Sequence, residues 1–372
     1  MRILCMLPAA RGVYPEEAEE REVSEAALEF THAHPFVFRD RRARGLVSWY
    51  VQDAVSPVKG LTVNLGLRYD HTSLLVSDQQ FSPRLGAVYY FPASKTAVRG
   101  SFNQLYMPPQ AENLLLADSE QARALSPFAA ETGGGAAIRP ERVSAYEAGV
   151  AQDLFGFVKL DVAAWWRSFR NFGDPNAFFN TTVIFPNSVA RGAARGVDVR
   201  LDVPECRGWS GYLSYTNQHV RQTGPINGGL FLTDEFIEIG PGTVFIPDHD
   251  QRNVASFGLT HRHAWRGFWA SLSGRHESGV PLEVEPERLP DLQSAPGSEL
   301  VDFGRGRVRP WTVFDFSAGM DLLRRERVTV GVQVDLQNLA NRPFAYNFGN
   351  PFEGTHFGHP RLVGGRIKFT FR

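Results

Sequence analysis

Several features that define common protein classes are scarce in this sequence. Cysteine occurs only at Cys5 and Cys206, and neither has a second cysteine or a histidine nearby at metal-ligand spacing. This spacing argues against a disulfide scaffold and against a zinc site. No run approaches the roughly 18 consecutive apolar residues that a transmembrane helix needs. The formal net charge is −1, from 39 basic and 40 acidic residues, so no global field attracts nucleic acid.

The residues that are abundant favour β structure. The chain has 28 Phe, 35 Gly and 24 Pro, a composition typical of strands separated by turns. From 61 to 70 the odd-numbered residues are apolar or aromatic and the even-numbered ones are polar or glycine, which predicts a strand with two dissimilar faces. Helical periodicity is confined to Glu16–Leu28, whose charge density suits a solvated segment equally well. The same alternation, strict or weaker, predicts about thirteen strands in all: 47–56, 61–70, 81–91, 96–105, 143–153, 156–170, 197–203, 208–220, 253–263, 267–277, 311–322, 328–336 and 362–371.

Short and long connections between these strands alternate. Phe91 to Lys95 and Ala264 to Arg266 are short turns, whereas long loops are expected at 106–142, 171–189, 221–251, 278–310 and 339–361. Outer-membrane barrels have this asymmetry between their two rims. Aromatic residues near strand ends, such as Trp49 and Trp165-Trp166, suit interfacial girdles, although any single ring could equally pack in a soluble core. The sequence therefore predicts an all-β fold: an antiparallel transmembrane β-barrel portion of about 12–14 strands with long extracellular loops.

Short motifs along the chain occur in an order typical of one family. They are Phe38–Arg42, Ser48–Asp53 with Leu61–Asp70, Phe81–Gly86 with Arg99–Phe102, Pro140–Gly149, Ala194–Asp198, Asp248–Asn253, and Leu336–Pro343 leading through Pro360-Arg361 to the last strand. On these motifs, over about 38–372, the chain resembles the barrel of TonB-dependent outer-membrane receptors, especially the Oar-like branch. The resemblance implies a place in the outer membrane of a Gram-negative cell, with membrane lipid around the barrel and a small-molecule or oligosaccharide ligand.

Two departures from the family pattern qualify this resemblance. No plug domain, TonB-box segment or early strands of a 22-stranded barrel are recognisable, so we expect a C-terminal barrel portion of a larger barrel. Coupling to the TonB complex would then require a plug supplied elsewhere. The second departure is the chain end, where Phe371 is followed by Arg372 although such barrels usually finish on an aromatic residue. The apolar stripe of the last strand, which includes Val363 and Ile367, is nevertheless intact.

Two groups of residues could carry metal chemistry. Asp248-His249-Asp250 with His261 and His263 has suitable ligand types, but the histidines fall at a strand end and the Asp-His-Asp run falls on a family landmark. His356 and His359, with Glu353, lie in the last long loop and could contact an iron chelate, but solvated loop residues are the simpler interpretation. No nucleophile motif or phosphate-binding loop is found, and Gly133-Gly134-Gly135 follows no strand. We therefore expect no enzyme and assign no catalytic, cofactor-binding or metal-ligating residue.

Three functions remain open on the sequence. The first is a TonB-dependent receptor for a large, scarce nutrient such as a siderophore, a cobalamin-like complex or an oligosaccharide. The second is a passive, self-contained porin-like channel. The third is a soluble all-β protein, although the repeat of about 40–50 residues typical of a propeller is absent. In the barrel interpretation, residues 1–35 form a poorly ordered or partly stranded N-terminal segment and residues 36–372 form the barrel portion.

Overall fold

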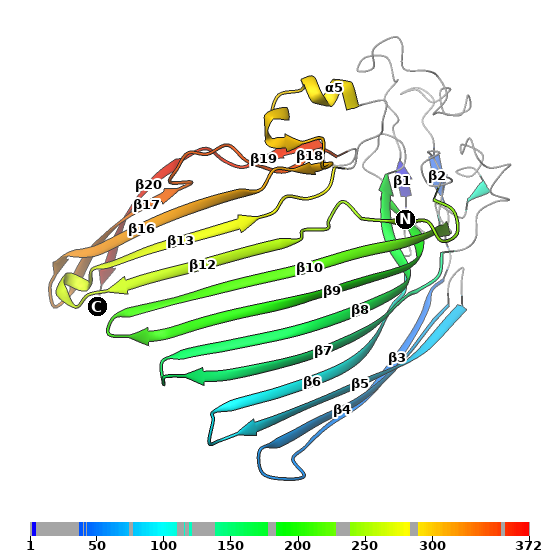
Figure 1. The fold of residues 1–372 in the computed structure, drawn as a ribbon, viewed down its shortest axis with the longest axis horizontal. Coiled ribbons are helices and arrows are strands. Elements are labelled where there is room, and N and C mark those ends of the chain that lie inside the picture. The colour runs from blue at the N-terminus through cyan, green and yellow to red at the C-terminus, as the bar shows by residue number, and fades with distance from the viewer. Residues whose placement is uncertain are drawn as a thin grey trace.

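The fold is one large antiparallel β-sheet, with α5, β18 and β19 near one end of it (Figure 1). The computed structural model describes residues 2–4, 37–39, 41, 43–73, 77–109, 115, 119–120, 138–177, 184–227, 239–282, 289–350 and 354–371. Neighbouring strands of the sheet follow one another in chain order: β3 (Gly45–Val55), β4 (Leu61–Ser73), β5 (Ser77–Phe91), β6 (Thr96–Met107), β7 (Glu141–Leu154), β8 (Val158–Ala177), β9 (Ile184–Cys206), β10 (Trp209–Asn227), β12 (Asn253–Arg262), β13 (Trp269–Glu277), β16 (Trp311–Arg324), β17 (Val328–Gln337) and β20 (Leu362–Phe371). The two-residue strand β11 (Val244–Phe245) pairs beside β10.

Tight turns join the strands at one end of the sheet. Between β9 and β10 the whole connection is Arg207-Gly208, with φ of 52° and 83°. Positive φ at both central residues is the turn geometry whose twist matches that of two paired strands. A side chain at Gly208 would also place a Cβ 2.5 Å from the carbonyl oxygen of Arg262, so this turn requires glycine.

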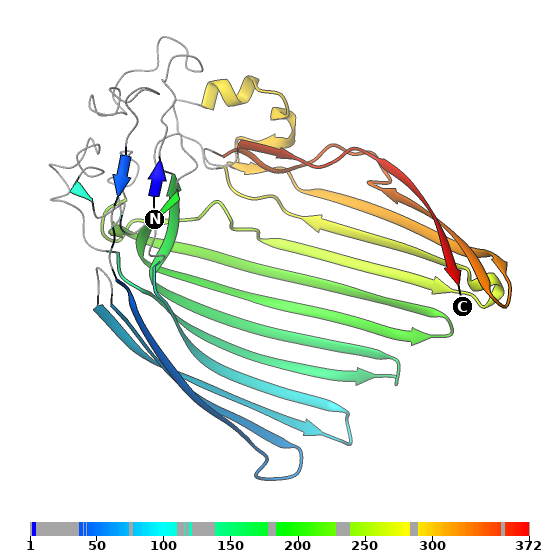
Figure 2. The ribbon, with the colours of Figure 1, turned by 180° about the vertical axis from the view of Figure 1, so that it is seen from behind.

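The sheet is not closed. β3 and β20 lie at its two ends and do not pair with each other, and Figure 2 shows the same open side from behind. An open edge exposes unpaired backbone groups, which is costly in lipid, and closed barrels avoid this. The sheet is therefore a partial barrel.

Short elements form a compact cap at the loop end, above β13 to β20 (Figure 1). The loop after β13 contains α5 (Leu289–Ser294), η3 (Ser298–Leu300), β14 (Val301–Asp302) and β15 (Arg307–Val308), and the loop after β17 contains β18 (Ala345–Asn350) and β19 (Gly354–Phe357). Val301, Val308, Ala345 and Phe348 form a buried cluster that joins the two loops. The turn after β12 holds the short helix η1 (Trp265–Gly267).

The thirteen strands predicted from the sequence are confirmed, but two predicted loops are partly wrong. Residues 171–177 and 184–189, expected in a loop, extend β8 and β9, and β10 continues to Asn227. These extensions pair with one another, and ladder pairing overrides the local preference of Gly and Pro for turns. The helix α5 was not predicted, and the possible helix Glu16–Leu28 lies outside the described residues.

The N-terminal segment is described only at β1 (Arg2–Leu4), which pairs with β2 (Val37–Arg39). The division at residue 36 stays a prediction. Among the described residues, no helix is long and apolar enough to cross a membrane.

Candidate functional site

The register gives the sheet two faces of opposite chemistry. Two residues that pair directly across neighbouring strands point to the same face of the sheet. One row of such pairs crosses β5 to β8 and consists of Leu85, Phe102, Tyr146 and Trp166. The neighbouring row on the other face runs Arg84, Asn103, Ala145 and Arg167. The same separation continues to the last strand, where Val332 pairs with Ile367 and Gln333 with Arg366.

The apolar face of the sheet is exposed. Side chains on it such as Phe81, Trp166 and Leu213 are 56%, 49% and 43% exposed. Buried hydrophobic clusters of the described residues lie instead at the loop end, in the cap and around Val189 and Ile226. The apolar stripes therefore do not meet across a dry centre, as they would in a soluble sandwich. In a membrane barrel this face contacts hydrocarbon.

The aromatic residues only partly follow the predicted girdles. Trp49, Trp166 and Trp209 share the apolar face. Trp165 and Trp269 lie on the polar face, because each is an odd number of residues away from an apolar-face residue of its own strand, Trp166 and Leu272 respectively.

Ion pairs hold the polar face in a fixed arrangement. Arg99 on β6 donates from Nη1 and Nη2 to the two carboxylate oxygens of Asp161 on β8, both at 2.8 Å, and from Nε to Glu147 Oε1 on β7 at 3.0 Å. The guanidinium crosses Gly149, where a Cβ would lie 2.7 Å from Arg99 Cζ. Bidentate geometry of this kind combines strength with a defined orientation. One arginine thus ties three strands together on the polar side.

Hydrogen-bonded carboxylates also occur on other strands of the polar face. Asp70 accepts hydrogen bonds from Arg68 Nε at 2.8 Å and from Ser48 Oγ at 2.6 Å. Asp335 accepts hydrogen bonds from Ser317 Oγ at 2.6 Å and from Gln333 Nε2 at 2.8 Å. Between these groups the Arg99 cluster lines a hollow of about 640 Å³, whose lining includes four basic and five acidic side chains. The polar face is therefore a wall of nearly balanced charge.

A tight contact on this wall gives a stability prediction. A Cβ at Gly196 would lie 2.5 Å from Trp165 Cζ2 and 2.7 Å from the carbonyl oxygen of Asn217. Because the second neighbour is backbone, Gly196→Ala is expected to lower the free energy of unfolding by about 1–3 kcal/mol, as overpacking does. Gly173→Ala is the matched control, since nothing lies within 4 Å of its Cβ position. Urea unfolding in lipid vesicles measures both, and equal stability of the two variants would contradict the contact.

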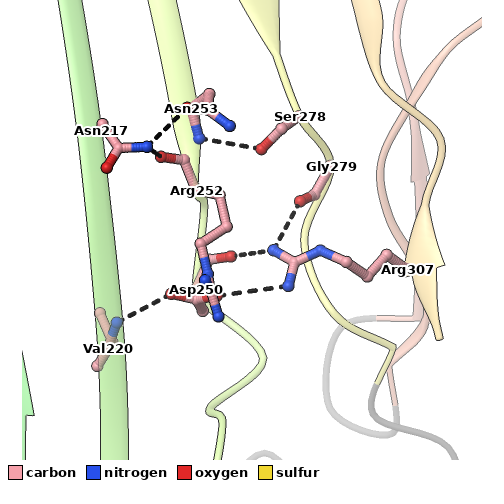
Figure 3. A network of polar contacts seen from close by, with 8 residues as sticks. All are labelled: Asn217, Val220, Asp250, Arg252, Asn253, Ser278, Gly279 and Arg307. Carbon is pink, nitrogen blue, oxygen red and sulfur yellow. Dashed lines mark hydrogen bonds and ion pairs between the residues drawn. The ribbon is translucent and has the colours of Figure 1, made fainter. Parts of the chain in front are cut away.

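The bases of the long loops are joined by a buried carboxylate (Figure 3). Asp250 has no exposed surface, and its Oδ1 accepts the backbone N–H of Val220 on β10 at 3.0 Å. Its Oδ2 is paired with Arg252 Nε and lies 3.4 Å from Arg307 Nη1. Arg307 also donates to the carbonyl oxygens of Asp250 and of Gly279, the latter at 3.1 Å. The loops after β10 and β13 are thereby locked together above the sheet.

Further hydrogen bonds extend this network to the strand ends. The backbone N–H of Asn253 donates to Ser278 Oγ at 3.0 Å, and Asn217 Nδ2 donates to Asn253 Oδ1 at 2.8 Å (Figure 3). The motif Asp248–Asn253, noted in the sequence as a family landmark, therefore fixes the start of β12 between its two neighbours.

The structure separates the candidate metal ligands of the sequence. Asp248 pairs with the exposed ring of His249, and Asp250 is held in the arginine network. His261 lies at the opposite end of β12, with its ring centroid 4.4 Å from that of Trp209, and His263 Nδ1 accepts the N–H of Trp265 at 3.1 Å. Eight residues of β12, about 26 Å of strand, separate the two groups.

The histidines of the last loop are likewise engaged locally. The backbone N–H of His356 donates to Asn347 Oδ1 at 2.8 Å, and His359 Nδ1 contacts the carbonyl oxygen of Pro360 at 2.9 Å. Glu353 lies outside the described residues. Within the described part of the chain, no group of three His, Cys, Asp or Glu residues is placed to hold a metal ion.

Comparison with known proteins identifies the architecture. The family model described as "TonB dependent receptor-like, beta-barrel" matches residues 28–339. The pyoverdine outer membrane receptor FpvA of Pseudomonas aeruginosa PAO1 is similar in structure, with a TM-score of 0.58 and 13% identity over 91% of this chain and 44% of that one. The ferric-catecholate import receptor Fiu of E. coli K12 gives 0.58 and 12%, over 87% and 45%, and the ferric citrate transporter FecA gives 0.57 and 14%, over 87% and 45%. A search of curated proteins found no match. The chain thus spans less than half the length of these solved receptors.

Proposed function

The chain belongs to the TonB-dependent receptor-like β-barrel family, and on this premise we propose that it builds one wall of a receptor that imports a large, scarce nutrient. Members of this family are outer-membrane β-barrels, so the protein is an outer-membrane protein. The observation that supports the proposal most directly is the continuous polar face, which would line a lumen while the opposite face contacts lipid. The locked loop bases at one rim would hold the long loops in position above that lumen.

The cargo class follows from the chemistry of the wall and from the relatives. Four basic and five acidic residues around the hollow favour neither sign of charge strongly, which suits a large hydrophilic cargo. FpvA, Fiu and FecA are named for pyoverdine, ferric catecholate and ferric citrate. We therefore rank a ferric siderophore first, followed by a cobalamin-like complex and an oligosaccharide. Energy coupling through the TonB complex is part of the proposal.

The passive porin-like channel receives no comparable support. A self-contained channel needs a closed wall, and the strands from β3 to β20 do not close on themselves.

Growth of a deletion strain tests the proposal. Cells lacking the gene are expected to lose growth on one class of cargo, supplied as the only source of iron, cobalamin or carbon. The gene on a plasmid should restore growth, but not when the TonB complex is inactivated. Restored uptake without the TonB complex would favour the passive channel, and unchanged uptake of every cargo would contradict a receptor role.

A further inference from the structure

Four adjacent strands carry an arginine at nearly the same distance from the short turns. Counted from the turn end of each strand, it is the thirteenth residue of β7, β8 and β10 and the twelfth of β9: Arg142, Arg170, Arg221 and Arg195. The aromatic residues Tyr146 and Trp166 are each the ninth residue by the same count. A strand crosses the hydrocarbon in about 9–11 residues, so the arginines lie just beyond it on the loop side.

These arginines share the lipid-facing side of the sheet. Arg195 pairs directly with Trp166, and Arg142 pairs with Arg170, which lies four residues beyond Trp166 on β8. Arg221 lies six residues beyond Tyr215 on β10, and an even spacing keeps both on one face. The side chains of Arg170, Arg195 and Arg221 therefore leave the barrel outward at the level of the lipid headgroups and do not line the lumen, whereas the guanidinium of Arg142 is drawn to Asp78 on β5.

The positive charge of this surface is hardly compensated. Arg191 on β9 pairs directly with Arg170, so Arg142, Arg170 and Arg191 form a row across three strands. Arg142 has an ion pair with Asp78 at 2.7 Å, whereas the other arginines are exposed and form no ion pair with a described residue. Like charges directly opposite each other are destabilising. Besides the arginines themselves, the nearest described positions around them on this face, two residues away or directly paired, hold Pro, Ser, Ala, Val, Phe, Tyr, Trp, His and Thr, and no carboxylate.

The patch is local. At the same distance from the short turns, the outward positions of β4, β5 and β16 are neutral: Ser73, Gln79 and Thr312. Three strand spacings separate β7 from β10, about 14 Å. The feature is therefore a site on one flank of the barrel, not a ring of positive charge around it.

We propose that this arginine band (Arg170, Arg191, Arg195 and Arg221) binds the phosphate-bearing headgroups of lipids in the outer leaflet. Arginine matches phosphate geometry with two parallel hydrogen bonds and is always charged. A headgroup with two phosphates bridges neighbouring strands and relieves the repulsion between opposed arginines. The proposal depends on the membrane placement and is independent of the cargo.

Lipid binding to purified protein tests this site. The protein is placed in phosphatidylcholine nanodiscs that contain a small fraction of a diphosphorylated glycolipid, and bound glycolipid is counted by native mass spectrometry after extraction. The variant Arg170→Gln/Arg191→Gln/Arg195→Gln is expected to bind about a hundredfold more weakly, from about fivefold per arginine near a membrane surface. The control Arg207→Gln/Arg266→Gln/Arg325→Gln removes the same charge at the short-turn rim and should bind like the wild type.

Two further arms separate the possible outcomes. The variant Arg170→Lys/Arg191→Lys/Arg195→Lys keeps the charge and should retain most of the binding, which excludes misfolding as the cause of the loss. Inorganic pyrophosphate serves as a soluble competitor and should displace the glycolipid only weakly. The lipid assignment is overturned if the glutamine variant of the arginine band binds like the wild type. It is also overturned if this variant and the short-turn control lose binding equally, or if pyrophosphate binds as tightly as the glycolipid.

Discussion

Replacing Asp250 by alanine is expected to destabilise the loop end of the protein by about 3–5 kcal/mol, because it leaves two partly buried arginines without the buried carboxylate that they share. Asp250 is fully buried, and the side chain of Arg307 is 22% exposed. The change removes the acceptor of the Val220 N–H and the carboxylate shared by two arginines. Hydrogen exchange should rise at Gly279 and around Arg307, and urea unfolding in lipid vesicles should show the lower stability.

Two variants control this experiment. Asp250→Asn keeps a side-chain acceptor for the Val220 N–H and should lose less stability than the alanine variant. Arg305→Ala removes an arginine that is 82% exposed and 3.7 Å from Asp302, and exposed pairs of this kind contribute at most about 1 kcal/mol. If the Asp250→Ala and Arg305→Ala variants were equally stable, the carboxylate would not be what joins the loops.

Placing a charge on the apolar face is expected to have the next largest effect. Leu65 is the fifth residue of β4 and is 46% exposed, so Leu65→Arg sets a cation near the middle of the hydrocarbon. Arginine there costs about 2–4 kcal/mol in barrels. The adjacent Asn64 points to the polar face and is exposed, so Asn64→Arg should change the stability by about 0.5 kcal/mol or less.

The comparison is made by urea unfolding in vesicles and repeated in detergent. Detergent deforms around a charge more easily than a bilayer does, so the difference between the two variants should shrink. An Asn64→Arg variant as unstable as the Leu65→Arg variant would mean that the two faces do not differ in their surroundings.

The strands could be predicted from the sequence because alternation of polar and apolar residues is a local signal. The pattern at 61–70 and 328–336 corresponds to β4 and β17. The outer parts of β8 and β9 could not be predicted, since Pro175 and Pro186 favour turns and only their pairing with each other shows a continued ladder. The family resemblance agrees with the matched family model.

The polar groups of the site were much harder to predict. Arg99 meets Glu147 and Asp161, which lie 48 and 62 residues further along the chain, and only the strand register brings them together. Asp250 drew attention in the sequence as a metal ligand, but its partner Arg307 is 57 residues away. The arginine band could have been found by counting from the short turns once the strands were assigned.

Accessibility along one strand tests the orientation of the sheet most directly. Spin labels placed singly at residues 210–217 of β10 in vesicles report collisions with oxygen, which concentrates in lipid, and with a water-soluble nickel complex. The two-faced sheet predicts a period of two, with oxygen collisions highest at 211, 213 and 215 and nickel collisions highest at 212, 214 and 216. A profile with the opposite phase, or one in which 211, 213 and 215 are shielded from both reagents, would contradict a lipid-facing apolar surface.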